Sequence, residues 1–341
     1  MILIALLSAT LLAGTGASTG RDTGSVGLSM FTTIDTQHGD TIHAALWYPS
    51  SDRPRDTTLR LQPLHVAPNG ALAYSAAPRP AIIISHGTGG DEMGHWDTAE
   101  SLARAGFIVI TIRHPGDNSR DHSGLGTDRY LYGRSAQIKV LLDAILADHV
   151  WRTRIDTSRI GALGYSVGGL TVLELFGGRP DPKRLGTYCI AHPVDPLYCA
   201  SDLHGQFTLT GQYTAPTSDH RIRSAVLLAP AWSFLFDRAG LAKVTAPLLI
   251  ERASLDSVVI EPDNVEHIVA ILPTKPTTGV INGAIHYSFL APCSAALARA
   301  VPEICADSPG FSRTSMHANL NANIVRFFER TLAVGVTTAT R

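Results

Sequence analysis

The sequence predicts an α/β fold built on one mostly parallel, doubly wound sheet, with an N-terminal antiparallel hairpin and a cap insertion. Short continuous apolar runs are typical of strands buried on both faces of a parallel sheet. Helical patterns alternate with these runs, as a doubly wound topology requires. The 341 residues are 45% hydrophobic and 17% charged, which indicates a globular chain with a substantial core.

The predicted elements follow in chain order. Two alternating segments, Met30–Asp35 and Thr41–Tyr48, flank a glycine turn and predict the hairpin. The segment Pro49–Pro80, rich in Pro, Arg and small residues, predicts a loop. The predicted parallel strands are Ala81–Ser85, Phe107–Ile112, Ile160–Leu163, Ala225–Ala229 and Leu248–Glu251, with Val280 and Ile281 as a weaker last candidate. The predicted helices are Asp97–Ala105, Tyr130–Ala147, Gly168–Phe176, Pro262–Ile271 and Asn319–Ala333.

One long segment, Gly177–Arg223, lacks periodicity and carries two cysteines. Loops of this length inside a compact domain are usually functional or disordered. We therefore expect residues 21–341 to form a single domain with a cap insertion at about 177–223.

All four cysteines lie in the second half of the chain. Their even number is typical of an oxidising compartment and allows three pairings. We expect the pairs that are near in sequence, Cys189 with Cys199 and Cys293 with Cys305. A zinc site is the alternative, but no CxxC spacing is present and the histidines are scattered, so we expect no metal and no other cofactor.

The first residues resemble a secretory signal. The apolar run Met1–Leu12 is too short to span a bilayer and precedes a small, polar stretch that ends at Gly20. No Lys or Arg follows Met1, so a start further upstream or a buried N-terminal strand remains an alternative. We expect residues 1–20 to be a signal peptide and the protein to be secreted or periplasmic.

The charge balance argues against a nucleic-acid partner. Lys and Arg number 28 against 29 Asp and Glu, a formal net charge of -1, and no basic stripe is present. Nothing in the sequence predicts an oligomeric state.

The motif G-x-S-x-G occurs at Gly164, Ser166 and Gly168, between a predicted strand and a predicted helix. A serine on such a sharp strand-to-helix turn needs neighbours without a Cβ, because the backbone there is crowded. The pentapeptide pattern alone is weak, but the strand before it and the helix after it are the context that the motif requires. Ser166 is therefore the candidate nucleophile.

A serine nucleophile needs a histidine base oriented by a carboxylate, in the chain order Ser, acid, His for this topology. His286 follows the last strand candidate and is the expected base; the other downstream histidines, His267 and His317, fall in or before helical patterns. Asp256, in the turn after Leu248–Glu251, is the expected acid. Its rivals are Glu251, Glu261 and Asp263.

The tetrahedral intermediate needs two donors for its oxyanion. We expect one to be the backbone N–H of Val167, directly after the nucleophile, and the other that of Thr88, in the glycine-rich loop after Ala81–Ser85. A phosphate-binding loop is the alternative, but neither G-x-G-x-x-G nor the P-loop lysine is present in this segment.

Together these residues resemble the α/β-hydrolase superfamily, and more narrowly its dienelactone-hydrolase and platelet-activating-factor-acetylhydrolase-like branch. The resemblance covers most of residues 30–330. It rests on Ile83–Gly87 with Gly89-Gly90, Arg113–Asn118, Asp156–Gly161, Gly164–Gly169, Gly283–Leu290 and Pro292-Cys293. It implies the α/β-hydrolase fold and a serine esterase whose triad is Ser166, Asp256 and His286.

The sequence departs from that branch at two positions. The dienelactone hydrolases proper use a cysteine nucleophile where this chain has Ser166, which favours ordinary ester hydrolysis over lactone opening. Tyr165 stands where the family commonly has histidine, which is expected to alter the pocket wall. The expected substrate contacts are His86, Gly87, Trp96, His114, Tyr165 and Tyr287. For His114, a capped turn at a strand end is an equal alternative.

The sequence thus predicts a carboxylic ester hydrolase that acts through an acyl-enzyme on a small-molecule ester. An amidase, thioesterase or lactonase would use the same triad. A non-catalytic hydrolase fold that only binds ligands is a further alternative, but such a module is expected to lack a triad member, and all three candidates are present.

Overall fold

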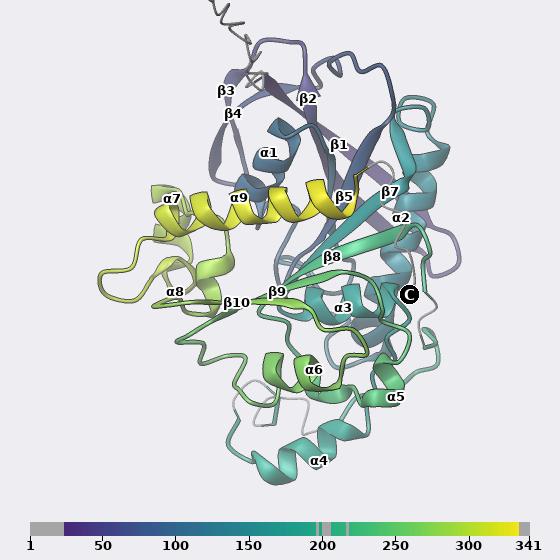
Figure 1. Cartoon of the computed structure of the whole chain (residues 1–341), viewed down its shortest axis with the longest axis vertical. Helices are drawn as coiled ribbons and strands as arrows, with labels where there is room; N and C mark the ends of the chain where they lie inside the picture. The colour runs from purple at the N-terminus through teal and green to yellow at the C-terminus, as the bar shows by residue number, and fades with distance from the viewer. Residues whose placement is uncertain (1–23, 196–197, 200–205, 216–217, 334–341) are drawn as a thin grey trace, which may run out of the picture.

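A computed structural model describes residues 24–195, 198–199, 206–215 and 218–333. The predicted signal segment, residues 1–20, lies outside them. The described residues form a ten-stranded sheet of order β10-β9-β8-β7-β5-β6-β2-β1-β4-β3, flanked by helices (Figure 1). Its strands are β1 Ser25–Asp35, β2 Asp40–Ser50, β3 Arg55–Leu59, β4 Gln62–Pro68, β5 Arg79–Ser85, β6 Ile108–Arg113, β7 Ile155–Tyr165, β8 Ile222–Leu228, β9 Leu248–Ala253 and β10 Thr277–Ile281.

Strands β5 to β10 run parallel, and the hydrophobic side chains of β5 to β9 are buried on both faces, whereas the edge strand β10 is largely exposed. In β5, Ile82 and Ile84 belong to the apolar cluster that includes helices α1 (Trp96–Arg104) and α9 (Arg313–Thr331). Ala81 and Ile83 belong to the cluster with α2 (Arg134–Ala147) and α3 (Val167–Leu175). Because the strands are parallel, their carboxyl ends lie along one edge of the sheet. The loops that follow β5, β7, β9 and β10 therefore meet at that edge.

The five predicted helices correspond to α1, α2, α3, α6 and α9, with most ends within a few residues of prediction, whereas α4, α5, α7 and α8 were not predicted. The α-helices of the described residues are α1 Trp96–Arg104, α2 Arg134–Ala147, α3 Val167–Leu175, α4 Arg184–Ala191, α5 Arg238–Leu241, α6 Val265–Ile271, α7 Ala295–Ala300, α8 Pro302–Cys305 and α9 Arg313–Thr331. The predicted helix from Tyr130 instead opens with a π-helical turn, Arg129–Gly133. Helix α9 begins six residues before the predicted Asn319, so His317 lies inside it.

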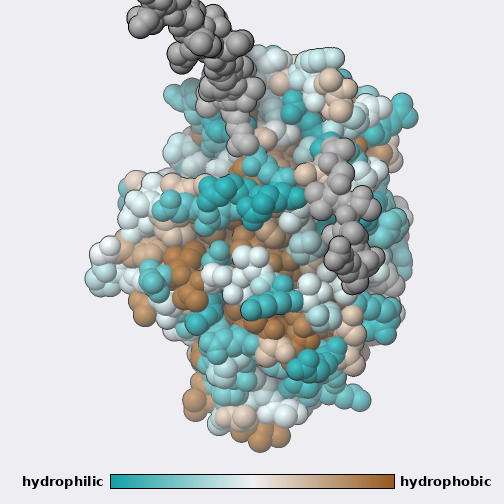
Figure 2. Space-filling view, in the orientation of Figure 1, coloured by the Kyte–Doolittle hydropathy of each residue, from teal (hydrophilic) through white to brown (hydrophobic). Residues whose placement is uncertain are grey.

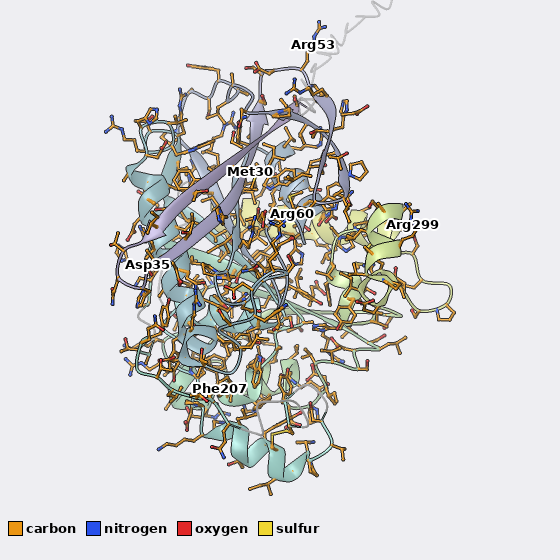
Figure 3. All side chains as sticks on the ribbon, turned by 180° about the vertical axis from the view of Figure 1, so that it is seen from behind. Met30, Asp35, Arg53, Arg60, Phe207 and Arg299 are labelled. Atoms are coloured by element: carbon orange, nitrogen blue, oxygen red, sulfur yellow. A yellow bond between two sulfur atoms is a disulfide. The ribbon has the colours of Figure 1, made fainter. Side chains whose placement is uncertain are left out.

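The predicted hairpin is present as β1 and β2, joined through a turn in which Gly39 has φ +75°. Figure 3 shows β1 from behind, with Met30 and Asp35 along it. The loop predicted at Pro49–Pro80 was wrong, because this segment contains the antiparallel strands β3 and β4. Their turn passes through Arg60 and Leu61, both with positive φ and neither a residue type that signals such a turn.

The predicted cap segment contains helix α4, which its weak periodicity did not indicate. The pairings Cys189–Cys199 and Cys293–Cys305 are confirmed as disulfides. The first disulfide holds the chain after α4 against that helix, where the Tyr188 ring stacks on Phe234 with centroids 3.9 Å apart. Parts of the predicted cap, 196–197, 200–205 and 216–217, lie outside the described residues.

Hydrophobic and hydrophilic residues are mixed over the face shown in Figure 2, with brown residues at the tip that α4 occupies in Figure 1. There Ile190 and Val194 are each 85% exposed. Within the described part of the chain, none of the helices has the length and apolar character needed to cross a membrane.

Candidate active site

Ser166 is the single residue between β7 and α3, and its backbone has φ 55° and ψ -123°. An L-residue rarely adopts this conformation, and such strain persists only where the surroundings enforce it. The glycines of the motif explain how the turn fits. A Cβ at Gly164 would lie 2.1 Å from the carbonyl oxygen of Gly168, and a Cβ at Gly168 would lie 2.2 Å from that of Ser85. The serine hydroxyl is thereby held at the carboxyl edge of the sheet.

The structure brings Ser166, His286 and Asp256 together. His286 Nε2 lies 3.1 Å from Ser166 Oγ, and His286 Nδ1 lies 2.8 Å from Asp256 Oδ2. The serine is 7% exposed and the histidine 4%. The carboxylate accepts the proton of Nδ1, so Nε2 has a free lone pair directed at the hydroxyl. This is the geometry in which an imidazole can take a proton from serine.

The loops that carry the acid and the base are bonded to each other. His286 begins a 3-10 turn, His286–Phe289, after β10, and Asp256 follows β9. Leu255 donates its backbone N–H to the carbonyl of Ala284 at 2.9 Å. The second oxygen of Asp256 accepts the backbone N–H groups of Val258 and Val259 at 2.9 and 2.8 Å. The carboxylate is thus fixed on both oxygens.

The rival acids have other partners. Glu251 lies in β9, and its carboxylate packs over Gly279 in the neighbouring strand β10, where a Cβ would lie 2.0 Å from Oε2. Burial raises the pKa of Glu251. Glu261 accepts the backbone N–H groups of Val265 and Glu266 at the start of α6, where a negative charge is favoured by the helix dipole. Asp263 lies 3.2 Å from His192.

Tyr165, expected in the pocket wall, is 3% exposed. Its hydroxyl donates to the backbone carbonyl of His286 at 3.1 Å, and its ring lies 5.0 Å from the imidazole. Gly87 also packs against this ring, because a Cβ there would lie 2.9 Å from the Tyr165 ring and 3.1 Å from Ser166 Cβ. Tyr165 therefore supports the histidine from within the protein instead of facing a ligand.

His86 and His114, two further expected contacts, are buried and bonded to protein groups. His86 Nε2 accepts the backbone N–H of His114 at 3.1 Å, so its own proton lies on Nδ1, which donates to the carbonyl of Gly87 at 2.6 Å. His114 lies 2.9 Å from both Ser85 Oγ and Gln137 Oε1. Burial, aided by the nearby Arg134 charge, lowers the pKa of each histidine well below 6.5, which keeps both rings neutral.

The remaining expected substrate contacts and the two expected oxyanion donors lie in different surroundings. Tyr287 is half-buried with its ring 5.6 Å from that of His286, and is adjacent to the triad. Trp96, at the start of α1, is half-buried and packs against the apolar cluster that contains Tyr165 and Phe289. Thr88 is exposed, and its hydroxyl lies 2.7 Å from the hydroxyl of Tyr130. Val167 is the first residue of α3, where an N–H has no acceptor within the helix.

Sequence reasoning missed several residues around this edge, including Arg134, Asp117 and Thr171, which are all buried. A motif signal was available only for Asp117, within the Arg113–Asn118 segment that carried part of the resemblance. No cluster of three or more His, Cys, Asp or Glu side chains suited to a metal occurs among the residues that the structure describes.

Part of the chain is similar in sequence to known cutinases. The chain is 31% identical over 159 residues to cutinase cut1 of Thermobifida fusca, which covers 41% of this chain and 47% of that protein. It is 33% identical over 105 residues to cutinase 2 of Thermobifida cellulosilytica, covering 30% and 36%. The chain thus spans less than half the length of these curated relatives. No family model matches the chain.

Among solved structures, the fold resembles a ferulic acid esterase from Streptomyces cinnamoneus with a TM-score of 0.62, at 17% identity over 90% of each chain. The narrower dienelactone-hydrolase and acetylhydrolase-like branch stays a prediction, because the matched relatives are cutinases. By its mixed sheet, its order of elements and this structural similarity, the chain has the α/β-hydrolase fold.

Proposed function

We propose that this chain hydrolyses carboxylic esters through an acyl-enzyme, with Ser166 as nucleophile, His286 as base and Asp256 as the orienting acid. The observation that carries the proposal is the continuous line of hydrogen bonds from Ser166 Oγ through the imidazole to Asp256, at 3.1 and 2.8 Å, on a strained nucleophile turn. Relatives and a structural neighbour whose names are cutinase and ferulic acid esterase support the same reaction class.

In the first half-reaction, Ser166 Oγ attacks the ester carbonyl carbon while its proton passes to His286 Nε2. The carbonyl oxygen becomes an oxyanion, for which we assign the backbone N–H groups of Val167 and Thr88 as donors. As the intermediate collapses, the bond to the alcohol breaks, and the alcohol leaves with the proton from His286.

In the second half-reaction, water takes the place of the alcohol. His286 accepts a proton from the water as its oxygen attacks the acyl carbon, and the same two amides stabilise the second oxyanion. Collapse of this intermediate returns the proton to Ser166 Oγ and releases the carboxylic acid. Side chains and backbone groups of this chain complete the cycle, so the proposal includes no cofactor.

The substrate proposed is a small-molecule ester. We assign Tyr287, whose ring lies 5.6 Å from that of His286, as a contact of this substrate. We also propose that the protein works outside the cytoplasm, secreted or periplasmic, because disulfides such as Cys189–Cys199 and Cys293–Cys305 persist in oxidising compartments.

The test compares purified wild type with Ser166→Ala on p-nitrophenyl acetate, butyrate and octanoate. We expect wild-type turnover that depends on chain length and disappears in the variant. A fluorophosphonate probe should add its mass to the peptide that contains Ser166. As a matched control, Ser233→Ala removes another buried hydroxyl, which bonds the Pro230 carbonyl, and should retain turnover.

A folded wild type with neither turnover nor labelling would refute the triad and favour the binding module. A panel of amides, thioesters and lactones, compared by kcat/KM, separates the other hydrolase classes. The ester assignment fails if any of these classes exceeds the best ester.

A further inference from the structure

Arg134 is a fully buried cation behind the candidate oxyanion hole. It is the first residue of α2 and 0% exposed. Removing a charge from water is costly unless close partners compensate it. Here its guanidinium is bonded to the buried carboxylate of Asp117 and also donates to the backbone carbonyl of His86.

The ion pair of Arg134 and Asp117 is hydrogen-bonded to the glycine-rich loop on both sides of Thr88. Arg134 bonds the carbonyl of His86, and Asp117 Oδ1 accepts the backbone N–H of Gly89 at 2.8 Å. The first of these groups belongs to the peptide unit before Gly87, and the second to the unit after Thr88. The peptide unit that carries the Thr88 N–H lies between them. Both of its neighbours are therefore tied to the same pair of charges.

The orientation of this central peptide unit is also fixed. The carbonyl of Gly87 accepts His86 Nδ1–H at 2.6 Å and the backbone N–H of Gly90 at 3.1 Å. A peptide unit is planar and trans, so its C=O and N–H point in opposite directions. Holding the Gly87 carbonyl against the loop therefore turns the Thr88 N–H away from it.

Arg134 is also connected, through Thr171, to the segment that carries the Val167 N–H, the other proposed oxyanion donor. Its Nε donates to Thr171 Oγ1 at 3.0 Å, and the Thr171 hydroxyl donates to the carbonyl of Val167 at 3.1 Å. Thr171 and Val167 lie one turn apart in α3, the helix that follows the nucleophile. One planar guanidinium, with its donors in a fixed fork, thus connects the segments that carry both amides.

We propose that Arg134, paired with Asp117, is a positioning residue that fixes the Thr88 and Val167 amides relative to each other and so preforms the oxyanion hole. The proposal rests on the ester hydrolysis proposed above. Preorganised donors need no reorientation when charge develops, and loss of one such donor costs roughly 10²–10³-fold in kcat. Disrupting the hydrogen bonds of Arg134 and Asp117 should weaken binding of the transition state and leave binding of the substrate nearly unchanged.

The test compares Arg134→Lys with wild type. Lysine keeps the charge but lacks the planar fork, so it cannot reproduce all of these bonds. We expect kcat to fall by roughly 10–100-fold with KM within about threefold, since the loss falls on the transition state. The affinity for a boronic acid that forms a tetrahedral adduct with Ser166 should fall in proportion to kcat/KM.

The control variant is Arg221→Lys, which alters a different and only partly buried ion pair, with Asp219, next to the start of β8. It should lower the Tm without changing kcat. If Arg134→Lys does not fold, Asp117→Asn provides the second variant, and its kcat should fall with boronic acid affinity in the same way.

A folded Arg134→Lys, or Asp117→Asn in its place, with wild-type kcat and boronic acid affinity would overturn this inference and leave the proposed function intact. Wild-type protein without Ser166-dependent turnover would instead refute the proposed function, and the inference with it. The two failures are therefore distinct.

Discussion

The Tyr165 hydroxyl donates a hydrogen bond to the backbone carbonyl of His286 across 3.1 Å, so the residue before the nucleophile supports the residue that carries the proposed base. The side chain of Tyr165 is also packed edge-on by His95, with centroids 5.3 Å apart. The hydrogen bond from Tyr165 to His286 connects the nucleophile turn after β7 with the loop after β10. It does so through a side chain that is buried away from the solvent.

The first prediction concerns this bond. Tyr165→Phe keeps the ring and removes the hydroxyl, leaving the buried His286 carbonyl without that donor. A net hydrogen bond is worth about 0.5–1.5 kcal/mol, so if the loss is expressed in the transition state, kcat should fall roughly 2–10-fold. Steady-state kinetics on p-nitrophenyl butyrate measures the change. Tyr48→Phe deletes a hydroxyl that bonds Ser29 and Gly70 and should leave kcat unaltered.

The second prediction concerns the crowding around Ser166. Gly168→Ala places a methyl group 2.2 Å from the backbone carbonyl of Ser85, where neither side can yield without moving the nucleophile turn or the oxyanion loop. We expect loss of turnover and a lower Tm. Gly94→Ala is the comparison, because its Cβ would meet no atom closer than 3.5 Å. A Gly168→Ala enzyme with wild-type kcat would contradict this account of the turn.

The nucleophile turn could be predicted from the sequence because its cause is local. An apolar run, glycines without Cβ and a following helix are all written in consecutive residues, and parallel topology then places the loops of Asp256 and His286 at the same edge. The support behind the site could not be predicted in this way. An arginine in a helical pattern is typical of a solvated face, and only tertiary packing places Arg134 beside Asp117 and His86.

The hairpin of β3 and β4 was missed for a different reason. Turn prediction relies on residue types that favour positive φ, and here Arg60 and Leu61 adopt φ 49° and 64° without that signal. Gln62 and Leu64 alternate with exposed neighbours in β4, but the surrounding prolines obscured the pattern. Pairing with β1 and β3 determined the conformation against the local preference.

The third prediction concerns Glu174, which is fully buried in α3. Burial raises its pKa well above the unfolded value of 4.5, so between these pKa values the folded state binds more protons than the unfolded state. The free energy of unfolding should therefore fall as pH rises above 4.5. Glu174→Gln removes this titration and should be more stable than wild type at neutral pH. Urea denaturation from pH 4.5 to 8 measures the difference.

For Glu174 the matched control is Glu303→Gln, which changes an exposed carboxylate in α8. Its stability curve should run parallel to that of wild type. If the free energy of unfolding of Glu174→Gln instead falls with pH as steeply as that of wild type, the Glu174 carboxyl does not cause this fall.

The last prediction concerns His317, which lies in α9 against the turn that begins at His286. Its Nδ1 contacts Asp97 at 2.6 Å and its Nε2 contacts the carbonyl of Ser288 at 2.8 Å, so both ring nitrogens face acceptors. Burial opposes the charged ring, but the hydrogen bond and the charge of Asp97 outweigh it and raise the pKa of His317 above 6.5. The imidazolium is therefore the form that the fold prefers.

The direction of the pH dependence follows from the linkage between protonation of His317 and folding. Because the folded pKa is raised, the stabilisation by His317 is complete below pH 6.5 and is lost as pH rises through the folded pKa. His317→Gln should destabilise the protein most at low pH, and its difference from wild type should shrink as pH increases. His65→Gln, which alters an exposed His–Asp pair, should show no such trend in chemical denaturation from pH 5 to 9. A difference for His317→Gln that grows with pH would mean that the fold prefers the neutral ring.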